Sequence, residues 1–501
     1  MVNDSSEYTS LLILAAEDCS AEEFAQFHSF SKQEQRFISN LIAHGPVLLK
    51  GARGSGKSAL MIEASRKMYP ENKTSAAFGI YISLRHLELL RSEGEKYEKT
   101  LCQLIIDAVK ETIIKSENPF EFEALPNITS LQKELSGLSS ASGKRIVILF
   151  DDAAHIGREA PLHEFFDMFR TLSNSTISCK AAIYPGVTKF GTRFDVYNDA
   201  TVIDVSRNDE LEGYNKNFAE IVRKRFLHQL PEESFSGQLT LEKVAGFMGR
   251  AVLGNMRGFL FAWNSLSANC KDNKISLADI TKTLIDLASN YYWPLIDELK
   301  PKLGIYAPMI DPATSIAESI FKEAGGQKKQ NVLILKEIVQ RLSKPLEILE
   351  YTGFISIRDV SRAMKSKGRG TRYSLNLCTL LEKIPGAKVT NQIYIEWLNE
   401  KNEKNEPLEL HKGSELFRIP LPELLGCGEM LILNSDISVL KKSKTYPYGL
   451  TEHKVNILKS ANYNTVAELA EASDDALLRL GEIGEGTLKR IRSTVAQAIW
   501  M

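Results

Sequence analysis

The sequence of 501 residues has no uninterrupted apolar run close to the ~18 residues that a membrane-spanning helix needs. Its first residues, MVNDSSEYTS, have neither the basic start nor the apolar stretch of a secretory signal. The six cysteines stand singly, without a Cys-x-x-Cys pair or a Cys/His cluster, which argues against a disulfide framework and against a zinc site. We therefore expect a cytoplasmic protein with buried thiols and no membrane partner.

An excess of charge of either sign is also missing, because 62 Lys and Arg residues stand against 63 Asp and Glu residues. This balance argues against a chain that is basic throughout, although it leaves local basic patches open. With 43% hydrophobic, 25% charged and 8% aromatic residues, the composition is that of a globular protein. At roughly 100–200 residues per domain, the length predicts about two to four domains.

Short apolar runs alternate with longer amphipathic segments over the first two hundred residues or so. This alternation predicts an α/β domain with a parallel sheet and covering helices. Ahead of the first run, Ser31 followed by Glu34 fits a capping box and predicts a helix over 32–43. The expected strands are 46–49, 78–84, 145–150, 180–184 and 201–205.

A glycine-rich segment after the first of these strands carries the most specific motif. Residues 51–58, GARGSGKS, match the pattern G-x-x-x-x-G-K-S/T between a predicted strand and a predicted helix. Glycines let backbone N–H groups turn toward phosphate oxygens, while Lys57 supplies a positive charge and Ser58 a hydroxyl for Mg²⁺. The alternative is a glycine turn with a chance Gly-Lys-Ser. We expect ATP and Mg²⁺ as cofactors, held by Gly51, Arg53, Gly54, Ser55, Gly56, Lys57 and Ser58.

The segment 144–152, KRIVILFDD, is an apolar strand that ends in two carboxylates and is typical of a Walker B site. Asp151 would hold the metal, and Asp152 stands where a carboxylate polarises the attacking water. The alternative for Asp152 is a cap of the next turn. About ninety residues separate the two motifs, which leaves room for an intervening strand and its helices. This spacing is that of the additional-strand P-loop ATPases.

With these motifs the chain resembles AAA+ ATPases over roughly residues 25–400, most closely the ORC-type branch with its bacterial relatives and the neighbouring STAND signalling ATPases. The resemblance implies that Thr188, or else Lys189, is a sensor 1 residue. It also implies that Arg193 is an arginine finger for a neighbouring copy in a homo-oligomer, the alternative being a solvated loop arginine. A Gly-x-x-Arg motif ending at Arg257 resembles sensor 2, the alternative being a helix-surface arginine.

Segment 331–377 fits a winged helix-turn-helix with two helices, the first an amphipathic helix over 333–342, followed by two strand-like runs around a loop. Between Phe354 and Arg372 this region holds six basic residues against one acid, Asp359. Such a basic glycine-containing loop suits phosphate or minor-groove contact with duplex DNA, and the alternative is a solvated charged hairpin. The expected DNA contacts are Arg358, Arg362, Lys365, Lys367, Arg369 and Arg372.

Residues 480–491, LGEIGEGTLKRI, have the pattern of a helix-hairpin-helix. Segment 448–499 resembles the C-terminal domain of the bacterial RNA polymerase α subunit. The hairpin N–H groups at Gly481 and Gly484, with Lys489 and Arg490, would hold a DNA phosphate. Glu482 and Glu485 would weaken such contact. Protein contact and a purely structural cap are the alternatives.

The fold class we predict is α/β: an AAA+-like P-loop NTPase sheet with a helical lid, followed by winged-helix and all-α helix-hairpin-helix domains. The resemblances imply an ATPase, slow or partner-stimulated, that couples ATP binding and hydrolysis to oligomeric or conformational state on duplex DNA. Bacterial anti-phage defence or a mobile element is the setting they suggest. The second hypothesis is a STAND-like signalling switch that recognises an effector protein. The boundaries we expect are 1–24 (extension), 25–208 (ATPase), 209–300 (lid), 301–400 (winged helix), 401–447 (linker) and 448–501 (helix-hairpin-helix).

Overall fold

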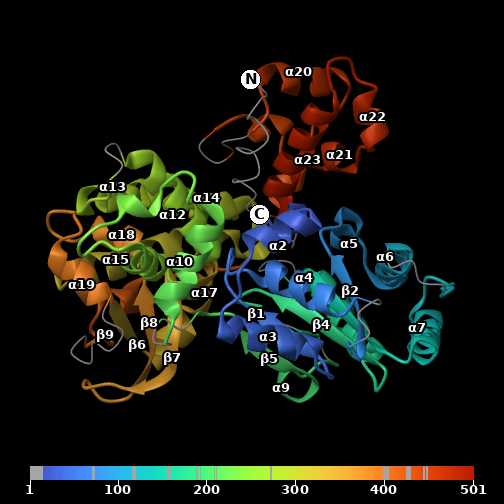
Figure 1. The fold of residues 1–501 in the computed structure, drawn as a ribbon, viewed down its shortest axis with the longest axis horizontal. Coiled ribbons are helices and arrows are strands. Elements are labelled where there is room, and N and C mark those ends of the chain that lie inside the picture. Colours follow the sequence, from blue (N-terminus) through green and yellow to red (C-terminus); the bar gives the residue numbers. More distant parts are fainter. Residues whose placement is uncertain are drawn as a thin grey trace.

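The computed structural model of the chain is shown in Figure 1. It describes residues 15–69, 74–115, 120–154, 159–187, 190–191, 193–207, 209, 212–270, 274–398, 406–424, 430–443, 446 and 449–500. Among these residues no helix is both long and apolar enough to cross a membrane. An α/β domain, a mixed region of helices with a small sheet, and a C-terminal group of helices follow one another along the chain (Figure 1).

The first domain is built on a five-stranded sheet in the order β2-β3-β4-β1-β5, and every pairing in it is parallel. All five expected strands are present, so the predicted α/β fold class is confirmed. Strand β4 lies between β1 and β3, which separates the strand before the glycine-rich loop from the strand that ends in two carboxylates. The strands are β1 Val47–Lys50, β2 Ala77–Ser83, β3 Arg145–Ala154, β4 Ile177–Ile183 and β5 Thr201–Asp204.

Helices cover both faces of this sheet because its central strands are apolar on both sides. Along β3, Val147 and Leu149 pack with α3 and α4, whereas Ile146, Ile148 and Phe150 pack with α6, α7 and α8. The capping box of Ser31 and Glu34 is present and begins α3 as predicted. The helices are α2 Ala21–Phe27, α3 Lys32–Ile42, α4 Lys57–Lys67, α5 Leu87–Arg91, α6 Gly94–Lys115, α7 Ile128–Ser142, α8 Glu159–Leu172 and α9 Val196–Asp199.

The middle of the chain packs around one hydrophobic core that runs from Tyr184 to Leu416 without a break at residue 300. Its first part is helical, as the periodicity of 209–300 predicts. The fully buried Trp263, Tyr292 and Phe321 lie in this core. The elements are α10 Tyr214–Arg225, α11 Leu241–Ala251, α12 Met256–Asn269, α13 Leu277–Leu287, a π-helical turn Ala288–Tyr292, α14 Trp293–Leu299 and α15 Ile310–Gly326.

Helix α15 is followed by a strand, two helices and a hairpin, which is the element order of a winged helix-turn-helix. The sheet has the order β7-β8-β6-β9, with β9 parallel to β6. The helix expected from 333 begins only at Lys336, because the apolar run before it is paired as β6. The elements are β6 Asn331–Leu335, α16 Lys336–Arg341, α17 Ser343–Thr352, β7 Ile355–Ala363, β8 Arg369–Leu375, α18 Leu377–Leu381, α19 Asn391–Leu398 and β9 Leu408–Leu410.

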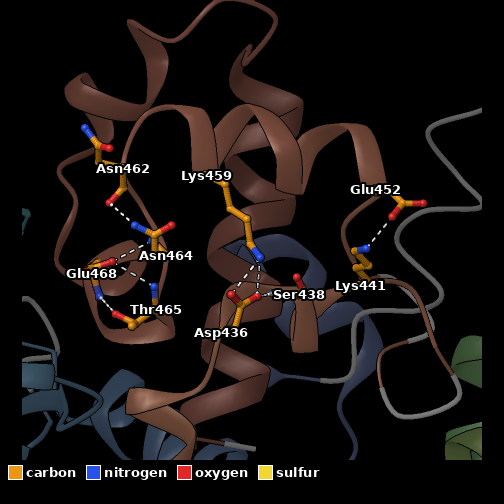
Figure 2. Close-up of polar contacts among 9 residues, drawn as sticks. All are labelled: Asp436, Ser438, Lys441, Glu452, Lys459, Asn462, Asn464, Thr465 and Glu468. Carbon is orange, nitrogen blue, oxygen red and sulfur yellow. Dashed lines mark hydrogen bonds and ion pairs between the residues drawn. The ribbon is translucent and has the colours of Figure 1, made fainter.

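The C-terminal helices have a hydrophobic core of their own, from Met430 to Trp500. Figure 2 shows polar contacts that join its first residues to its helices: Lys459 Nζ lies 2.8 Å from Asp436 Oδ2, and Lys441 lies 2.7 Å from Glu452. Residues 430–443, which the sequence assigns to a linker, therefore belong to this domain. The elements are two 3-10 turns, Leu431–Asn434 and Ile437–Leu440, and the helices α20 Glu452–Ser460, α21 Val466–Glu471, α22 Asp474–Leu478 and α23 Glu485–Trp500.

Candidate nucleotide site

The glycine-rich loop lies between β1 and α4, as its sequence predicts, and wraps the side chain of Lys57. The Lys57 Nζ donates to the carbonyl oxygens of Gly51 (2.7 Å) and Ala52 (3.1 Å) and lies 3.7 Å from the ring centre of Tyr184. Burial lowers the pKa of Lys57 to about 8, against the opposing charges of Asp152 and Asp151. The site thus holds a desolvated ammonium group whose charge an anion would stabilise.

Ser58 and Asp151 come together at the start of α4 and the end of β3. The Asp151 carboxylate accepts hydrogen bonds from Ser58 and from Tyr81 Oη, the latter at 2.8 Å. Burial raises the pKa of Asp151 to about 7, and the neighbouring Asp152 adds to the rise. A hydroxyl beside one buried carboxylate fits Mg²⁺, which takes few protein ligands and completes its shell with phosphate oxygens and water. No cluster of three or more His, Cys, Asp or Glu side chains suited to a metal occurs among the described residues.

Asp152 is held on both carboxylate oxygens. Its Oδ2 accepts from Arg85 Nε at 2.6 Å, and its Oδ1 accepts from Tyr184 Oη at 2.9 Å. Arg85 also forms an ion pair with Glu17 at 2.7 Å. Arg85 belongs to no motif, although it lies two residues after the end of β2, whose Ser83 is paired with Asp151. Side chains at the carboxyl ends of adjacent parallel strands meet at one edge of the sheet. The position of Arg85 after a predicted strand could therefore have placed it near Asp152.

The start of α12 is in direct contact with the glycine-rich loop. The N–H of Arg257 donates to Gly54 O at 3.1 Å, and Asn255 Nδ2 donates to Arg53 O at 2.6 Å. Gly54 has φ +78°, and a Cβ there would lie 2.6 Å from the Cβ of Arg257, so only glycine fits this approach. The Arg257 Nε is buried without a hydrogen-bond partner, and Arg257 lowers the pKa of Lys57 after the larger effect of burial. Arg257 therefore places a buried, unpartnered guanidinium nitrogen beside the glycine-rich loop.

A single cavity joins these groups to an apolar end that the motifs did not predict. One part of the cavity is lined by the loop, Lys57, Ser58, Arg85 and Arg257. The other end is lined by side chains from α2, α10 and α12 and by Trp500, the last residue of α23. These apolar-end residues are Phe27, His28, Phe30, Ile221, Arg225, Met256, Leu260 and Trp500.

A buried chain of charged groups joins the glycine-rich loop to α23. Arg53 lies 3.9 Å from Glu298, Glu298 lies 2.8 Å from Lys302, and Lys302 Nζ donates to Gln497 O at 3.0 Å. The side chains of Arg53, Glu298 and Lys302 are at most 9% exposed. The Nε and Nη1 of Arg53 are buried without a partner, and its N–H donates to Tyr351 O of α17 at 3.1 Å. Arg53 of the loop is therefore connected to α17 directly and to α23 through Glu298 and Lys302.

Arg193 stands apart from the described part of this cavity. Thr188 and Lys189 lie outside the described residues. Arg193 is exposed, its carbonyl accepts from Arg170, and it does not line the described part of the cavity of its own chain.

The β7–β8 hairpin, called the wing from here on, holds the six basic residues of 354–372. Most of them are in ion pairs. Arg358 lies 3.1 Å from Asp209, Lys365 2.5 Å from Glu406, and Asp359 lies 3.6 Å from Arg362 and 3.5 Å from Arg372. The acids Asp209 and Glu406 come from outside the 354–372 segment, so its charge count overstates the free positive charge. Arg369 is exposed and bonded to Ser361, and Lys367, at φ +71° in the turn, forms no ion pair among the described residues.

The C-terminal hairpin exposes the residues that its motif singled out. Gly481 and Gly484 are exposed and have open space where a Cβ would stand, and Lys489 and Arg490 are exposed on α23. Glu482 Oε2 lies 2.6 Å from His453 Nε2, and Lys454 bonds to the Glu482 carbonyl. The bond from His453 lowers the pKa of Glu482.

No protein-family model and no curated protein sequence matches the chain. Among solved structures, Cdc6p from Pyrobaculum aerophilum is similar at 13% identity, with a TM-score of 0.33 over 81% of this chain and 99% of that one. The ORC1 protein of Aeropyrum pernix, solved in complex with DNA, has 13% identity and a TM-score of 0.32 over 78% and 96%. Domain III of the Thermotoga maritima replication initiation protein DnaA has 16% identity and a TM-score of 0.29 over 57% and 98%. Similarity at this level establishes neither the family nor the activity of the chain.

Proposed function

We propose that the chain is an ATP-dependent DNA-binding protein of AAA+ ORC-like type, which couples nucleotide state to its conformation on duplex DNA. The observation that carries the proposal is the convergence of Lys57 and Ser58 of α4 with Arg257 of α12 on one cavity, where Asp151 of β3 accepts a hydrogen bond from Ser58. Lys57 and Arg257 would neutralise the phosphates of ATP. Ser58 and Asp151 would hold Mg²⁺, which supplies further neutralisation of the phosphate charge when it is bound.

The contacts around Asp152 favour slow hydrolysis. A carboxylate that polarises water needs an oxygen free to accept the proton or a hydrogen bond from that water. Here Arg85 and Tyr184 occupy both oxygens. Each oxygen can accept a second hydrogen bond, but the charge of Arg85 makes Asp152 a weaker base. Turnover should therefore rise when Arg85 moves away, for example toward Glu17, the second anion that it contacts. A phosphate group or a bound partner that draws Arg85 away would accelerate hydrolysis.

Coupling to the recognition modules would pass through Arg53. The loop must rearrange when phosphate oxygens replace the carbonyl partners of Lys57, and Arg53 lies within that loop. Its contacts with Tyr351 and with Glu298 then change together, which alters how α17 and α23 are held. Differential contacts of this kind in two nucleotide states are what shifts a conformational equilibrium.

The DNA contacts we propose are phosphate contacts. Lys489 and Arg490 on α23, and Lys367 and Arg369 on the wing, are exposed cations on two separate surfaces. Phosphate contacts of this kind give affinity that depends on salt and carry little sequence information. The exposed Arg193 would complete the site of a neighbouring copy in a homo-oligomer.

The test is the ATPase rate with and without duplex DNA at ~50 and ~200 mM salt, for the native chain, Lys57→Ala and the double variant Lys489→Ala/Arg490→Ala. We expect no turnover from Lys57→Ala, a DNA stimulation that falls severalfold with salt, and a loss of stimulation in the double variant. A rate per molecule that rises with protein concentration supports Arg193 as a residue acting between copies. ATP turnover by Lys57→Ala at the native rate would overturn the assignment of the site.

The second candidate is a STAND-like signalling switch with a protein partner, for example in bacterial anti-phage defence. The observation that favours it is the pairing of most wing cations with acids of the same chain, which leaves little free charge for DNA. Nucleotide binding without any DNA response in the same experiment would select this candidate.

A further inference from the structure

His28, at the apolar end of the cavity, has an imidazole ring that is fixed from several sides. The ring stacks on Phe24 with centroids 4.1 Å apart and an interplanar angle of 19°, and Phe30 lies 6.3 Å away in nearly parallel orientation. Nδ1 lies 3.0 Å from the carbonyl oxygen of Phe24. Behind the ring, the His28 carbonyl accepts from Lys224 Nζ at 2.7 Å. The ring therefore has little freedom to turn.

These contacts also fix which nitrogen carries the hydrogen. A carbonyl oxygen only accepts, so Nδ1 must be the donor. Burial, together with the smaller effect of the nearby Arg225, lowers the pKa of His28 to about 4. The ring is therefore neutral near pH 7. In a neutral imidazole with the hydrogen on Nδ1, Nε2 is a hydrogen-bond acceptor. Because Nδ1 is used by the Phe24 carbonyl and His28 lines the cavity, Nε2 is the ring nitrogen that remains for a ligand.

We propose that His28 selects the nucleotide base, accepting a hydrogen bond at Nε2 from a purine with an amino group at position 6. This rests on the proposed function, since it concerns the base of the nucleotide whose phosphates the glycine-rich loop would hold. Adenine presents a 6-amino donor, whereas guanine and hypoxanthine present a 6-oxo acceptor that would face the lone pair of Nε2. Phe27, Phe30, Met256 and Leu260 give the apolar surroundings in which a mismatched polar contact is costly.

The test measures equilibrium dissociation constants of ATP and of inosine triphosphate, which differs from ATP at position 6. It uses the native chain, His28→Phe, which keeps the stack on Phe24 but removes the acceptor, and Lys57→Ala. We expect the native chain to prefer ATP by about tenfold, the equivalent of one well-made hydrogen bond. His28→Phe should bring the ratio to within about twofold by weakening ATP alone, and its unchanged affinity for inosine triphosphate shows that the site is intact.

Two results overturn the inference: a native chain that binds both nucleotides equally, or a His28→Phe variant that keeps the native preference. Neither affects the proposed function, because the phosphate contacts would still be present. A native chain that binds neither nucleotide, like Lys57→Ala, would instead overturn the proposed function. His28→Gln is the second variant, since its side-chain amide reaches the position of Nε2, where its oxygen restores an acceptor and should recover part of the preference for ATP.

Discussion

The nucleotide cavity and the basic wing both depend on positive charge, but the two regions hold their cations differently. In the cavity, two nitrogens of Arg53 and one of Arg257 are buried without a hydrogen-bond partner. In the wing, exposed cations such as Arg362 and Lys365 are already paired with acids of the same chain. The first arrangement favours the arrival of an anion, whereas the second is satisfied without one.

The energies of the two arrangements differ accordingly. A buried donor left unpaired costs about 1–3 kcal/mol, which an anionic ligand can recover. An exposed ion pair contributes about 0–1 kcal/mol and must be broken before a DNA phosphate can use its cation. Substitutions in the buried network should therefore have large effects, and substitutions in the wing small ones.

The largest effect should come from Lys302→Met, which breaks the buried chain between the loop and α23. Removing this ammonium leaves Glu298 with the 3.9 Å contact to Arg53 as its remaining ion pair among the described residues. We expect a loss of about 2–4 kcal/mol in the free energy of unfolding, measured by denaturant titration. We also expect DNA to lose its stimulation of ATP turnover, since the connection to Gln497 is gone.

Lys300 provides the matched control for that change. It lies two residues earlier and pairs with Asp311 at 3.4 Å, but the two side chains are 54% and 77% exposed. Lys300→Met should cost less than about 0.5 kcal/mol and leave the DNA response unchanged. Equal effects of the two substitutions would contradict the distinction between buried and exposed pairs.

Glu350 on α17 should give a smaller effect that depends on pH. Burial raises its pKa to about 7, with Asp204 and Glu347 adding to the rise and Lys50 opposing it, and Tyr373 also faces it. The folded state then keeps a proton that the unfolded state loses at lower pH. Its stabilising contribution is complete below the ordinary pKa of a glutamate and is lost as the pH rises through about 7.

We therefore expect the free energy of unfolding to fall by about 1–2 kcal/mol between pH 5 and pH 8 through this group. Glu350→Gln should remove that part of the pH dependence. Glu337→Gln is the comparison, because its carboxylate is exposed, lies 2.6 Å from Lys412 and does not contribute to the pKa of Glu350. An unchanged pH profile in Glu350→Gln would show that the helix is docked without a protonated Glu350.

The sequence predicted those parts of the molecule that depend on neighbouring residues. The five strands, the capping box at Ser31 and the loop at 51–58 follow from periodicity and local chemistry, which nearby residues determine. The prediction of a helix over 333–342 was wrong at its start. The apolar residues there fit a helix, but residues 331–335 pair with β8 and form β6. That pairing is a tertiary contact, and helical periodicity does not reveal it.

The parts of the site that the sequence did not reveal come from segments far apart in the chain. Arg85 forms an ion pair with Asp152, 67 positions further along the chain, and Arg53 contacts Glu298. His28 is the residue that follows α2, ahead of the glycine-rich loop. Arg85 and His28 belong to no motif, and the motif of Arg53 does not indicate its contact with Glu298, since these contacts arise from burial and from which neighbour the fold supplies. The charge of the wing was overestimated for the same reason, because Asp209 and Glu406 are distant in sequence.

The smallest effect should come from the wing itself, where Lys367 and Arg362 make a matched pair. Lys367 forms no ion pair among the described residues, whereas Arg362 lies 3.6 Å from Asp359. Lys367→Ala should weaken duplex DNA binding by about two- to fivefold at ~50 mM salt and reduce the slope of log affinity against log salt by nearly one. Arg362→Ala should change affinity by less than about twofold, because that cation is already neutralised. Fluorescence anisotropy with one duplex at several salt concentrations measures both quantities. If Arg362→Ala weakens binding as much as Lys367→Ala, then DNA displaces the ion pair and the wing binds with more of its charge than its own contacts indicate.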